Sequence, residues 1–474
     1  MRTLVWFRRD LRTRDNTALA AAARHADDGV VAVFLMSPKQ WREHDEAACK
    51  VEFWLRNLRE LKKMLAGRNI PLIIETADRF SDVPKTLLRI ARKSKCNALH
   101  FNREYEVNEC RRDEAVIELF EREGLSVASH TDHVIFEPGE VLTGEGKYYG
   151  VFTPFKKKYW SMIQEHGINV TPMPRQQKPI DIASSEVPEA VSGFKSSGID
   201  PDVWPGGEDH AKNRLDSFIE NRIHSYKDDR DFPAINATST LSPYLNAGVI
   251  SPRQCIRAAM SANDDKIDSG QKGIVHWISE VIWREFYQHI LVGYPRVSMH
   301  RPFRLETNHI QWEDNEEHFQ AWCDGCTGYP LVDAAMRQMK EVGWMHNRLR
   351  MVAAMFLTKD LFLDWRRGEQ FFMRHLVDGD LGSNNGGWQW SASTGTDAAP
   401  YFRIFNPISQ SRKFDSDGAF IRKYVPELDG LDGKSIHDPS EIPELLKQDL
   451  DYPAPIVDHR AARDRVMKAF QAIK

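Results

Sequence analysis

The sequence predicts an α/β N-terminal domain with a parallel sheet, followed by a large all-α C-terminal domain. Two observations predict this fold class. In the first third of the chain, short apolar runs rich in β-forming residues alternate with longer amphipathic segments, which is typical of a parallel sheet. Beyond residue 207, apolar residues recur at helical spacing with few β-branched runs, which indicates helices.

The predicted strands are four short apolar runs, at residues 4–7, 30–36, 71–76 and 98–101. The predicted helices between them are the amphipathic segments at 48–66, 81–95 and 109–123. Parallel sheets bind ligands at the carboxyl ends of their strands. However, FRRDLRTRDN follows the first strand where a glycine-rich dinucleotide fingerprint would stand, so we do not expect an ordinary nucleotide-cofactor sheet.

A long connector is predicted where residues 165–207 become rich in Pro, Ser, Gly and charged side chains. We therefore expect an α/β domain over residues 1–132, a connector over 133–207 and a helical domain over 208–474.

The composition favours a globular, cytoplasmic protein. Of the 474 residues, 41% are hydrophobic and 28% are charged, and no apolar run approaches the roughly 18 residues of a membrane span. The six cysteines are scattered, as expected in a reducing compartment, and the CDGC at 323–326 favours a loop with two free thiols. A net charge of −4 argues against indiscriminate nucleic-acid binding but is compatible with a local basic face.

Tryptophan is concentrated in the helical domain, with eight of the thirteen between residues 277 and 390. In HWISEVIWREFYQH, Trp277, Glu280, Trp283 and Arg284 occur at i, i+3, i+6 and i+7, which places a carboxyl between two indoles on one side of a helix. Such a carboxyl would be desolvated, its pKa would rise, and it would donate a hydrogen bond. A solvated glutamate beside core tryptophans is the other interpretation.

A second helical segment, GWMHNRLRMVAAM, places Asn347 and Met351 on one face, with Arg348 and Arg350 beside it. Asparagine is a poor core residue unless its amide has a partner, so this face favours a polar ligand. Residues 346–375 carry six Lys or Arg against three Asp or Glu. With its interleaved aromatic residues, this basic stretch is either a nucleic-acid face or a solvated helix surface.

The stretch DGDLGSNNGGWQWSASTGTD, residues 378–397, combines acidic side chains, asparagines and two tryptophans on a glycine-rich backbone. A tight turn is one interpretation, because Gly-Asn clusters are common in turns. The other is a flexible acidic loop that presents Asp378, Asp380 and Asn384 to a cavity for a ring system with several N–H donors and acceptors. If the tryptophans begin a helix, Trp388 and Trp390 lie about 200° apart and point to opposite sides.

The chain resembles the photolyase/cryptochrome family, and most of all the bacterial class I cyclobutane pyrimidine dimer (CPD) photolyases. The resemblance runs essentially from end to end, and five segments carry it: VWFRRDLR (5–12), WREFY (283–287), TGYPLVDAAMRQ (327–338), GWMHNRLR (343–350) and DGDLGSNNGGWQWSASTGTDAAPYFRIFNP (378–407). It implies a Rossmann-like N-terminal antenna domain and a helical, FAD-binding catalytic domain.

The resemblance implies FAD, fully reduced when active, as the catalytic cofactor. The residues that match the family's FAD contacts are Tyr226, Thr238, Ser239, Thr240, Leu241, Ser242, Trp277, Arg350, Asp378, Asp380 and Asn384. Among them, the hydroxyl-rich run 238–242 matches the phosphate-binding segment, Arg350 matches the partner of Asp378, and Asn384 matches the side chain that faces the flavin N5.

The implied activity is light-driven repair of CPDs, in which excited reduced FAD donates an electron to a dimer flipped out of the DNA. The residues that match the family's dimer contacts are Glu280, Trp283, Asn347, Met351 and Trp390. The residues that match its electron-transfer chain are Trp388, Trp365 and Trp312. The residues that match its DNA-facing positions are Arg230, Arg284, Arg348 and Gln410. The implied partner is UV-damaged DNA, single- or double-stranded, bound by a monomer in the cytoplasm, at the nucleoid, without a membrane.

The antenna cofactor is implied less directly. His44, Asn108 and Glu109 match the contacts of relatives that carry 5,10-methenyltetrahydrofolate, whereas Ser298 and Met299 stand where a cysteine and a lysine are expected. Folate is the preferred antenna, and a flavin, a deazaflavin or an empty site are the alternatives.

Three alternative functions are weighed against CPD repair. A cryptochrome-type blue-light photoreceptor usually has a C-terminal extension, and the chain continues only about 67 residues past FRIFNP. A (6-4) photolyase usually has a histidine where Asn347 stands. A conventional flavin oxidoreductase would need a nicotinamide site, which the sequence does not show.

Overall fold

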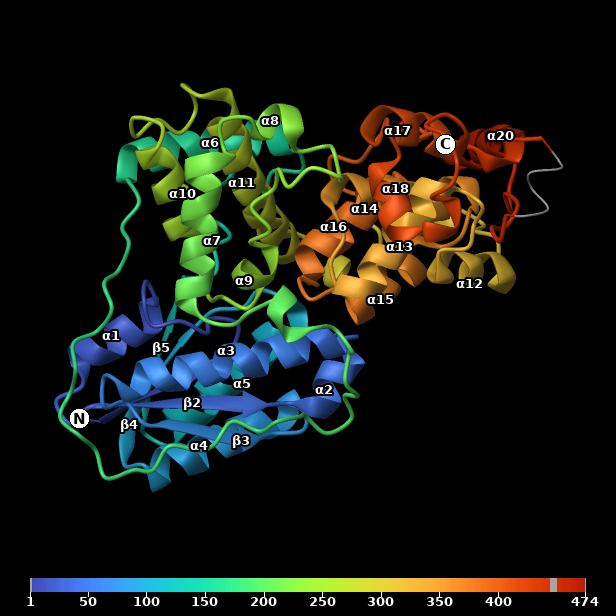
Figure 1. Cartoon of the computed structure of the whole chain (residues 1–474). Helices are drawn as coiled ribbons and strands as arrows, with labels where there is room; N and C mark the ends of the chain where they lie inside the picture. Colours follow the sequence, from blue (N-terminus) through green and yellow to red (C-terminus); the bar gives the residue numbers. More distant parts are fainter. Residues whose placement is uncertain (1, 444–449, 474) are drawn as a thin grey trace. The chain divides into compact units, whose positions relative to one another are not determined.

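The computed structural model describes residues 2–443 and 450–473. The chain forms two compact units, whose elements are shown in Figure 1. Unit 1 comprises Met1–His224, Ser239–Ser298 and Val377–Gly379. Unit 2 comprises Ser225–Thr238, Met299–Leu376 and Asp380–Lys474.

Unit 1 contains a five-stranded parallel sheet in the order β3-β2-β1-β4-β5 (Figure 1). The strands are β1 (Arg2–Phe7), β2 (Val30–Met36), β3 (Leu72–Thr76), β4 (Cys96–Asn102) and β5 (Ser126–His130). The first four contain the predicted apolar runs, so the predicted parallel sheet is confirmed. The sequence patterns do not predict β5, because this edge strand reads SVASH and is too exposed to need an apolar run.

Helices pack around this sheet. The three predicted helices correspond to α3 (Ala48–Ala66), α4 (Val83–Lys93) and α5 (Val107–Arg122). Two further helices were not predicted from the pattern, α1 (Thr17–His25) and α2 (Pro38–Glu43). Side chains of α4 and α5 share one hydrophobic core with Leu4, Trp6 and Val31 of the sheet.

Unit 1 continues past residue 208 into the helical part of the chain. Its further helices are α6 (Phe152–His166), α7 (Glu208–Asn221), α9 (Ser242–Asn246), α10 (Pro252–Ser261) and α11 (Lys272–Gly293). The predicted connector therefore contains one helix, α6, which buries Phe152 and Tyr159.

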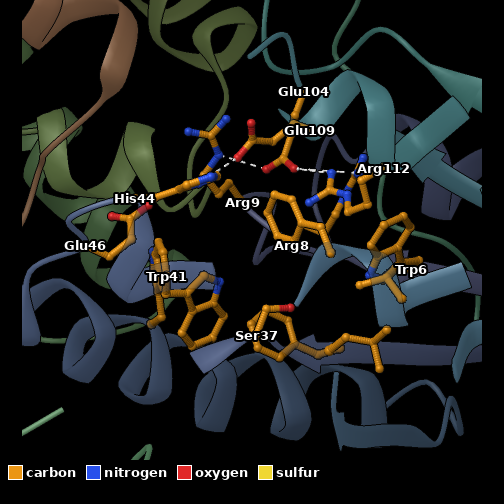
Figure 2. A pocket seen from close by; sticks show the side chains of 15 residues that line it. Trp6, Arg8, Arg9, Ser37, Trp41, His44, Glu46, Glu104, Glu109 and Arg112 are labelled. Carbon is orange, nitrogen blue, oxygen red and sulfur yellow. Dashed lines mark hydrogen bonds and ion pairs between the residues drawn. The ribbon is translucent and has the colours of Figure 1, made fainter. Parts of the chain in front are cut away.

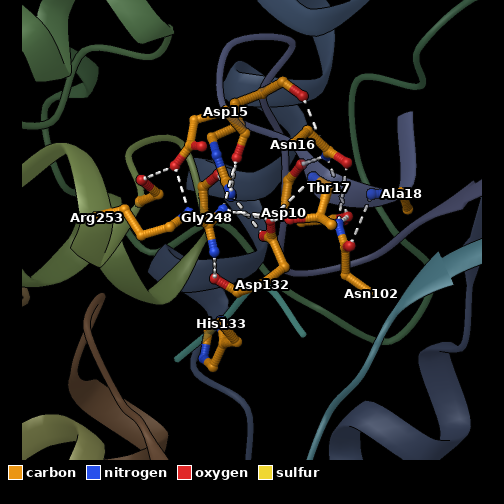
Figure 3. A network of polar contacts seen from close by, with 12 residues as sticks. Asp10, Asp15, Asn16, Thr17, Ala18, Asn102, Asp132, His133, Gly248 and Arg253 are labelled. Atoms are coloured by element: carbon orange, nitrogen blue, oxygen red, sulfur yellow. Dashed lines mark hydrogen bonds and ion pairs between the residues drawn. The ribbon is translucent and has the colours of Figure 1, made fainter. Parts of the chain in front are cut away.

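A buried network of charged residues occupies the turn after β1, where a dinucleotide fingerprint would stand (Figure 3). Arg12 binds Asp132 at 2.6 Å, and Arg253 of α10 binds Asp132 at 2.7 Å and Asp15 at 2.8 Å. Asp132 also accepts a hydrogen bond from the backbone N–H of Thr17 at 3.0 Å. The FRRDLRTRDN segment thus joins the sheet to α10 through paired charges.

Unit 2 is helical among its described residues. Its helices are α8 (Tyr226–Asp229), α12 (Glu316–Asp324), α13 (Pro330–Val342), α14 (Asn347–Met355), α15 (Trp365–His375), α16 (Leu381–Ala392), α17 (Pro407–Phe414), α18 (Ala419–Tyr424) and α20 (His459–Ala472). Its core includes Trp322, Trp365 and Trp388. Cys323 and Cys326 are free thiols, the first buried and the second exposed.

Candidate functional site

The three predicted antenna residues lie together in unit 1. Asn108 and Gln40 each contact the Nε2 atom of His44 at 3.0 Å, and His44 Nδ1 lies 3.4 Å from a carboxylate oxygen of Glu109. Burial alone would lower the pKa of His44, but the hydrogen bond to Glu109 raises it above its ordinary value. The sequence did not point to Gln40, which precedes His44 by one helical turn.

His44 and Glu109 of this cluster also line a pocket at the carboxyl ends of the strands (Figure 2). Arg8 and Arg112 are among its lining residues. Arg8 and Arg112 lie over the indole of Trp6 at 4.3 and 4.8 Å, Arg8 binds Asp113 at 2.6 Å, and Arg112 binds Glu104 at 2.7 Å. The remaining cavity has a volume of about 60 Å³, whereas ligand pockets usually measure about 300–1,000 Å³.

Helix α11 carries four predicted site residues: the FAD contact Trp277, the lesion contacts Glu280 and Trp283, and the DNA-facing Arg284. Trp277 is 3% exposed, and its indole N–H donates to the Ser239 hydroxyl at 3.3 Å. The Glu280 side chain is 33% exposed, with its carboxylate 3.6 Å from His276 Nε2. Of the two interpretations of this glutamate, the partial exposure agrees better with the solvated one. Arg284, predicted to face DNA, donates to the backbone carbonyl of His133 at 2.8 Å.

The sequence did not point to the residue that supports Trp283. Phe152 of α6 stacks face to face on the Trp283 indole, with ring centroids 3.7 Å apart and planes inclined by 13°. One indole face is therefore covered, while the side chain remains partly exposed. Lys156, one turn further along α6, lies 3.5 Å from the Ser279 hydroxyl; burial lowers the pKa of Lys156, and the charge of Glu280 opposes this shift.

Unit 1 also contains most of the predicted phosphate-binding run. Arg214 of α7 donates to the Thr240 hydroxyl, next to Ser239. Thr240 has a φ of 48°, a left-handed conformation that is uncommon for a β-branched residue. Leu241 is buried and Ser242 begins α9. In unit 2, Tyr226 is buried, with Arg230 over its ring at 5.4 Å, and Thr238 ends the short segment that belongs to this unit.

Asp378 is 7% exposed and lies in the segment of unit 1 that two donors hold in place. The ammonium of Lys50 and the amide of Asn246 both donate to the carbonyl of Gly379, the second at 3.2 Å. This anchoring fixes the backbone beside a buried carboxylate.

The stretch predicted as a flexible loop is mostly the helix α16, so that interpretation was wrong. Asp380 caps the helix, because its carboxylate accepts the Ser383 N–H at 2.8 Å. The Asn384 amide donates to the Glu369 carbonyl of α15 at 2.9 Å. As predicted for a helix, Trp388 is buried at 2% exposure while Trp390 is partly exposed.

Helix α14 carries the remaining predicted cofactor and lesion residues of unit 2. Its first residue is Asn347, which is exposed, and Met351 is partly exposed one turn later. Arg350 donates to the Met345 carbonyl at 2.8 Å. Arg348 binds Asp231 at 2.7 Å, so two of the predicted DNA-facing residues, Arg348 and its neighbour in space Arg230, share this carboxylate.

The three predicted electron-transfer tryptophans differ in exposure. Trp365 and Trp388 are 1% and 2% exposed, whereas Trp312 is partly exposed and packs on Phe362 at 5.1 Å. Gln410, the last predicted DNA-facing residue, lies on α17.

Gly368 makes room for the indole of Trp388, so we expect Gly368→Ala to destabilise unit 2. A Cβ at this position would lie 2.1 Å from the Trp388 ring, and overpacking a buried ring costs about 1–3 kcal/mol. Gly387→Ala is the matched control, since this helical glycine has open space around it and Ala favours a helix over Gly by about 1 kcal/mol. Measured by urea unfolding, Gly368→Ala should lower the free energy of unfolding and Gly387→Ala should raise it. Equal stability of the two variants would contradict this packing.

Each unit, taken by itself, contains polar groups that suit part of an FAD molecule. In unit 1, the hydroxyls of Ser239 and Thr240 and the guanidinium of Arg214 suit a diphosphate. In unit 2, the buried Asp380 and the amide of Asn384 suit the hydrogen-bonding groups of a ring or ribose.

Several known proteins are similar to this chain. Residues 3–176 match the family described as DNA photolyase, and residues 277–472 match the FAD binding domain of DNA photolyase. The deoxyribodipyrimidine photo-lyase of Escherichia coli is 43% identical, over 99% of this chain and 98% of that protein.

Two solved structures are also similar. A class III photolyase from Agrobacterium tumefaciens is 35% identical, with a TM-score of 0.88 over 99% of this chain and 97% of that chain. An archaeal photolyase from Sulfolobus tokodaii with two FAD molecules is 30% identical, with a TM-score of 0.83 over 100% of both chains. Because these similarities extend over both units, the chain belongs to the photolyase/cryptochrome family.

Proposed function

We propose that this protein is a CPD photolyase, which splits pyrimidine dimers in UV-damaged DNA under blue light. The observation that carries the proposal is Trp283 of α11, which remains partly exposed although Phe152 of α6 stacks on its indole at 3.7 Å. A partly exposed indole that is held in place by a stacked ring suits stacking on a base that has left the duplex. The end-to-end similarity to proteins named deoxyribodipyrimidine photo-lyase supports the same function.

In this proposal, bound FAD in its fully reduced form supplies the light-excited electron that opens the dimer. Arg214, Ser239 and Thr240 hold the diphosphate, while Asp380 and Asn384 hydrogen-bond the ring system. The other proposed FAD contacts are Tyr226, Thr238, Leu241, Ser242, Trp277, Arg350 and Asp378.

The dimer itself is proposed to contact five side chains. Trp283 and Trp390 bracket the flipped bases, Glu280 and Asn347 hydrogen-bond them, and Met351 packs on them. The exposure of Asn347 and the partial exposure of Glu280 support this role, because both polar groups can reach a ligand. A hydrogen-bond donor placed where negative charge develops stabilises that charge.

Binding to DNA is proposed to use Arg230, Arg284, Arg348 and Gln410, and the protein is proposed to act as a monomer at the nucleoid. Every helix among residues 2–443 and 450–473 is too short or too polar to cross a membrane. We assign the antenna domain to residues 1–132, the connector to 133–207 and the catalytic domain to 208–474, an order that the two family matches support.

For the antenna, we propose 5,10-methenyltetrahydrofolate bound at His44, Asn108 and Glu109. The polar cluster that these residues form supports the proposal. A flavin or a deazaflavin at the same residues is the alternative assignment. To test this assignment, the purified protein is reconstituted with 5,10-methenyltetrahydrofolate and the absorbance of the bound cofactor is measured.

The direct test of the function is to illuminate the purified, reduced protein with dimer-containing DNA and to follow the recovery of pyrimidine absorbance. Recovery that requires light is expected. A protein that binds FAD and damaged DNA without restoring this absorbance would instead be a photoreceptor.

We expect Trp283→Ala to weaken binding to dimer-containing DNA by about 1–3 kcal/mol, because stacking on a flipped base is lost. Affinity for undamaged DNA should change little, since phosphate contacts persist. Titration of both DNAs measures the two affinities, with Trp160→Ala, a partly exposed tryptophan of α6, as the control. If both affinities fall equally, Trp283 belongs to the fold rather than to the lesion pocket.

A further inference from the structure

A carboxylate lies between two of the arginines that are proposed to face DNA. In unit 2, Asp231 Oδ2 lies 2.7 Å from Arg348 Nη2, and Asp231 Oδ1 lies 3.8 Å from Arg230 Nε. One negative charge is therefore shared by two positive charges. Asp231 is not among the residues that match functional positions of photolyases.

The carboxylate is the most exposed of the three groups. The side chain of Asp231 is 31% exposed, against 16% for Arg348 and 13% for Arg230. The Arg348 guanidinium also packs on the ring of Phe414 of α17, with its central carbon 4.4 Å from the ring centroid. A phosphate that approaches these arginines from solvent therefore meets the carboxylate as well as the guanidinium groups.

We propose that Asp231 competes with DNA phosphates for Arg348 and Arg230 and so limits the affinity of this protein for the DNA backbone. The inference rests on the proposed function. Binding to undamaged DNA depends on the number of phosphates that cationic side chains neutralise. An intramolecular carboxylate that already pairs with Arg348 removes part of this contribution, so binding depends more on the stacking contacts that only a lesion provides.

The amide substitution Asp231→Asn removes the charge and keeps the shape and a carbonyl acceptor for Arg348. Gaining the equivalent of one phosphate contact steepens the slope of log K against log salt by about 0.9 and tightens binding about five- to tenfold near 0.1 M salt. We expect this change for undamaged duplex, measured by fluorescence anisotropy over a salt series. Dimer-containing duplex should gain by a similar factor, because phosphate contacts carry no sequence information.

Two controls distinguish the effect of the Asp231–Arg348 ion pair from the effect of the protein's net charge. Asp228→Asn removes one negative charge from the exposed side of the neighbouring helix α8, and its affinity should change less than that of Asp231→Asn. When Arg348 is already replaced by Met, Asp231→Asn should increase the affinity for DNA much less than it does in the parent protein.

Unchanged or weaker binding of undamaged DNA by Asp231→Asn would overturn the proposal and would mean that Asp231 only orients the arginines. An equal gain in Asp228→Asn would also overturn it, since overall charge would then explain the effect. These outcomes leave the proposed function intact. In contrast, a parent protein that binds no DNA at all would remove both the function and this inference.

Discussion

Asp132→Ala is expected to lower the free energy of unfolding of unit 1 by about 3–5 kcal/mol, the usual cost of removing one partner of a buried ion pair. Asp132 is 1% exposed and binds Arg12 at 2.6 Å and Arg253 at 2.7 Å. Its loss leaves two buried guanidinium groups without this carboxylate, and it also removes the acceptor of the Thr17 N–H.

The pH dependence of this variant has a defined sign. Burial would raise the pKa of Asp132, but Arg12 and Arg253 outweigh burial and lower the pKa to about 2. A carboxyl whose pKa is depressed in the folded state stabilises the protein above its unfolded pKa of about 3.9, and the stabilisation is lost as the pH falls towards the folded value. The difference between parent and variant should therefore be constant from pH 8 to pH 5 and should shrink below pH 4.

Urea unfolding followed by circular dichroism measures this difference. Asp181→Ala, which removes an exposed carboxylate of the same unit, should change stability by no more than about 0.5 kcal/mol. A loss as small as this in Asp132→Ala would show that solvent or neighbouring groups replace the carboxylate.

The same network shows how far the sequence could predict the fold. The sequence lacks a glycine-rich fingerprint after β1, and the structure places a network of paired charges in this turn. The role of the arginines could not be predicted, because Arg12 and its partner Asp132 are separated by 120 residues, and Arg253 lies a further 121 residues along the chain. Pairing between charges so far apart depends on tertiary packing and leaves no local pattern.

For helix α16, the loop predicted from local residue propensities was wrong. Its Gly and Asn residues favour turns, and the sequence predicted a loop. The Asp380 cap and the bond from Asn384 to the Glu369 carbonyl of α15 stabilise a helix instead. The stacking of Phe152 on Trp283 could not be predicted from the sequence, because a phenylalanine at the start of a helix is usually an ordinary core residue.

Trp312→Phe is expected to slow or abolish the accumulation of reduced FAD under blue light and an external thiol. The proposed chain of Trp388, Trp365 and Trp312 runs from two buried indoles to a partly exposed one, which supports Trp312 as the group that a reductant in solvent can reach. Phenylalanine keeps most of the ring volume, so the packing on Phe362 should survive, but its ring is much harder to oxidise than an indole.

The measurement pairs two readouts on the same variant. Flavin absorbance during illumination reports the indole chain, and dimer splitting after reduction with dithionite reports the lesion pocket, which contains none of these three tryptophans. We expect the first to fail and the second to match the parent. Trp344→Phe, which alters another partly exposed indole of unit 2, should accumulate reduced FAD normally. Normal photoreduction in Trp312→Phe would require another route to the surface, whereas loss of repair after chemical reduction would mean that Trp312 is structural, because an indole used only for reduction has no part in splitting the dimer.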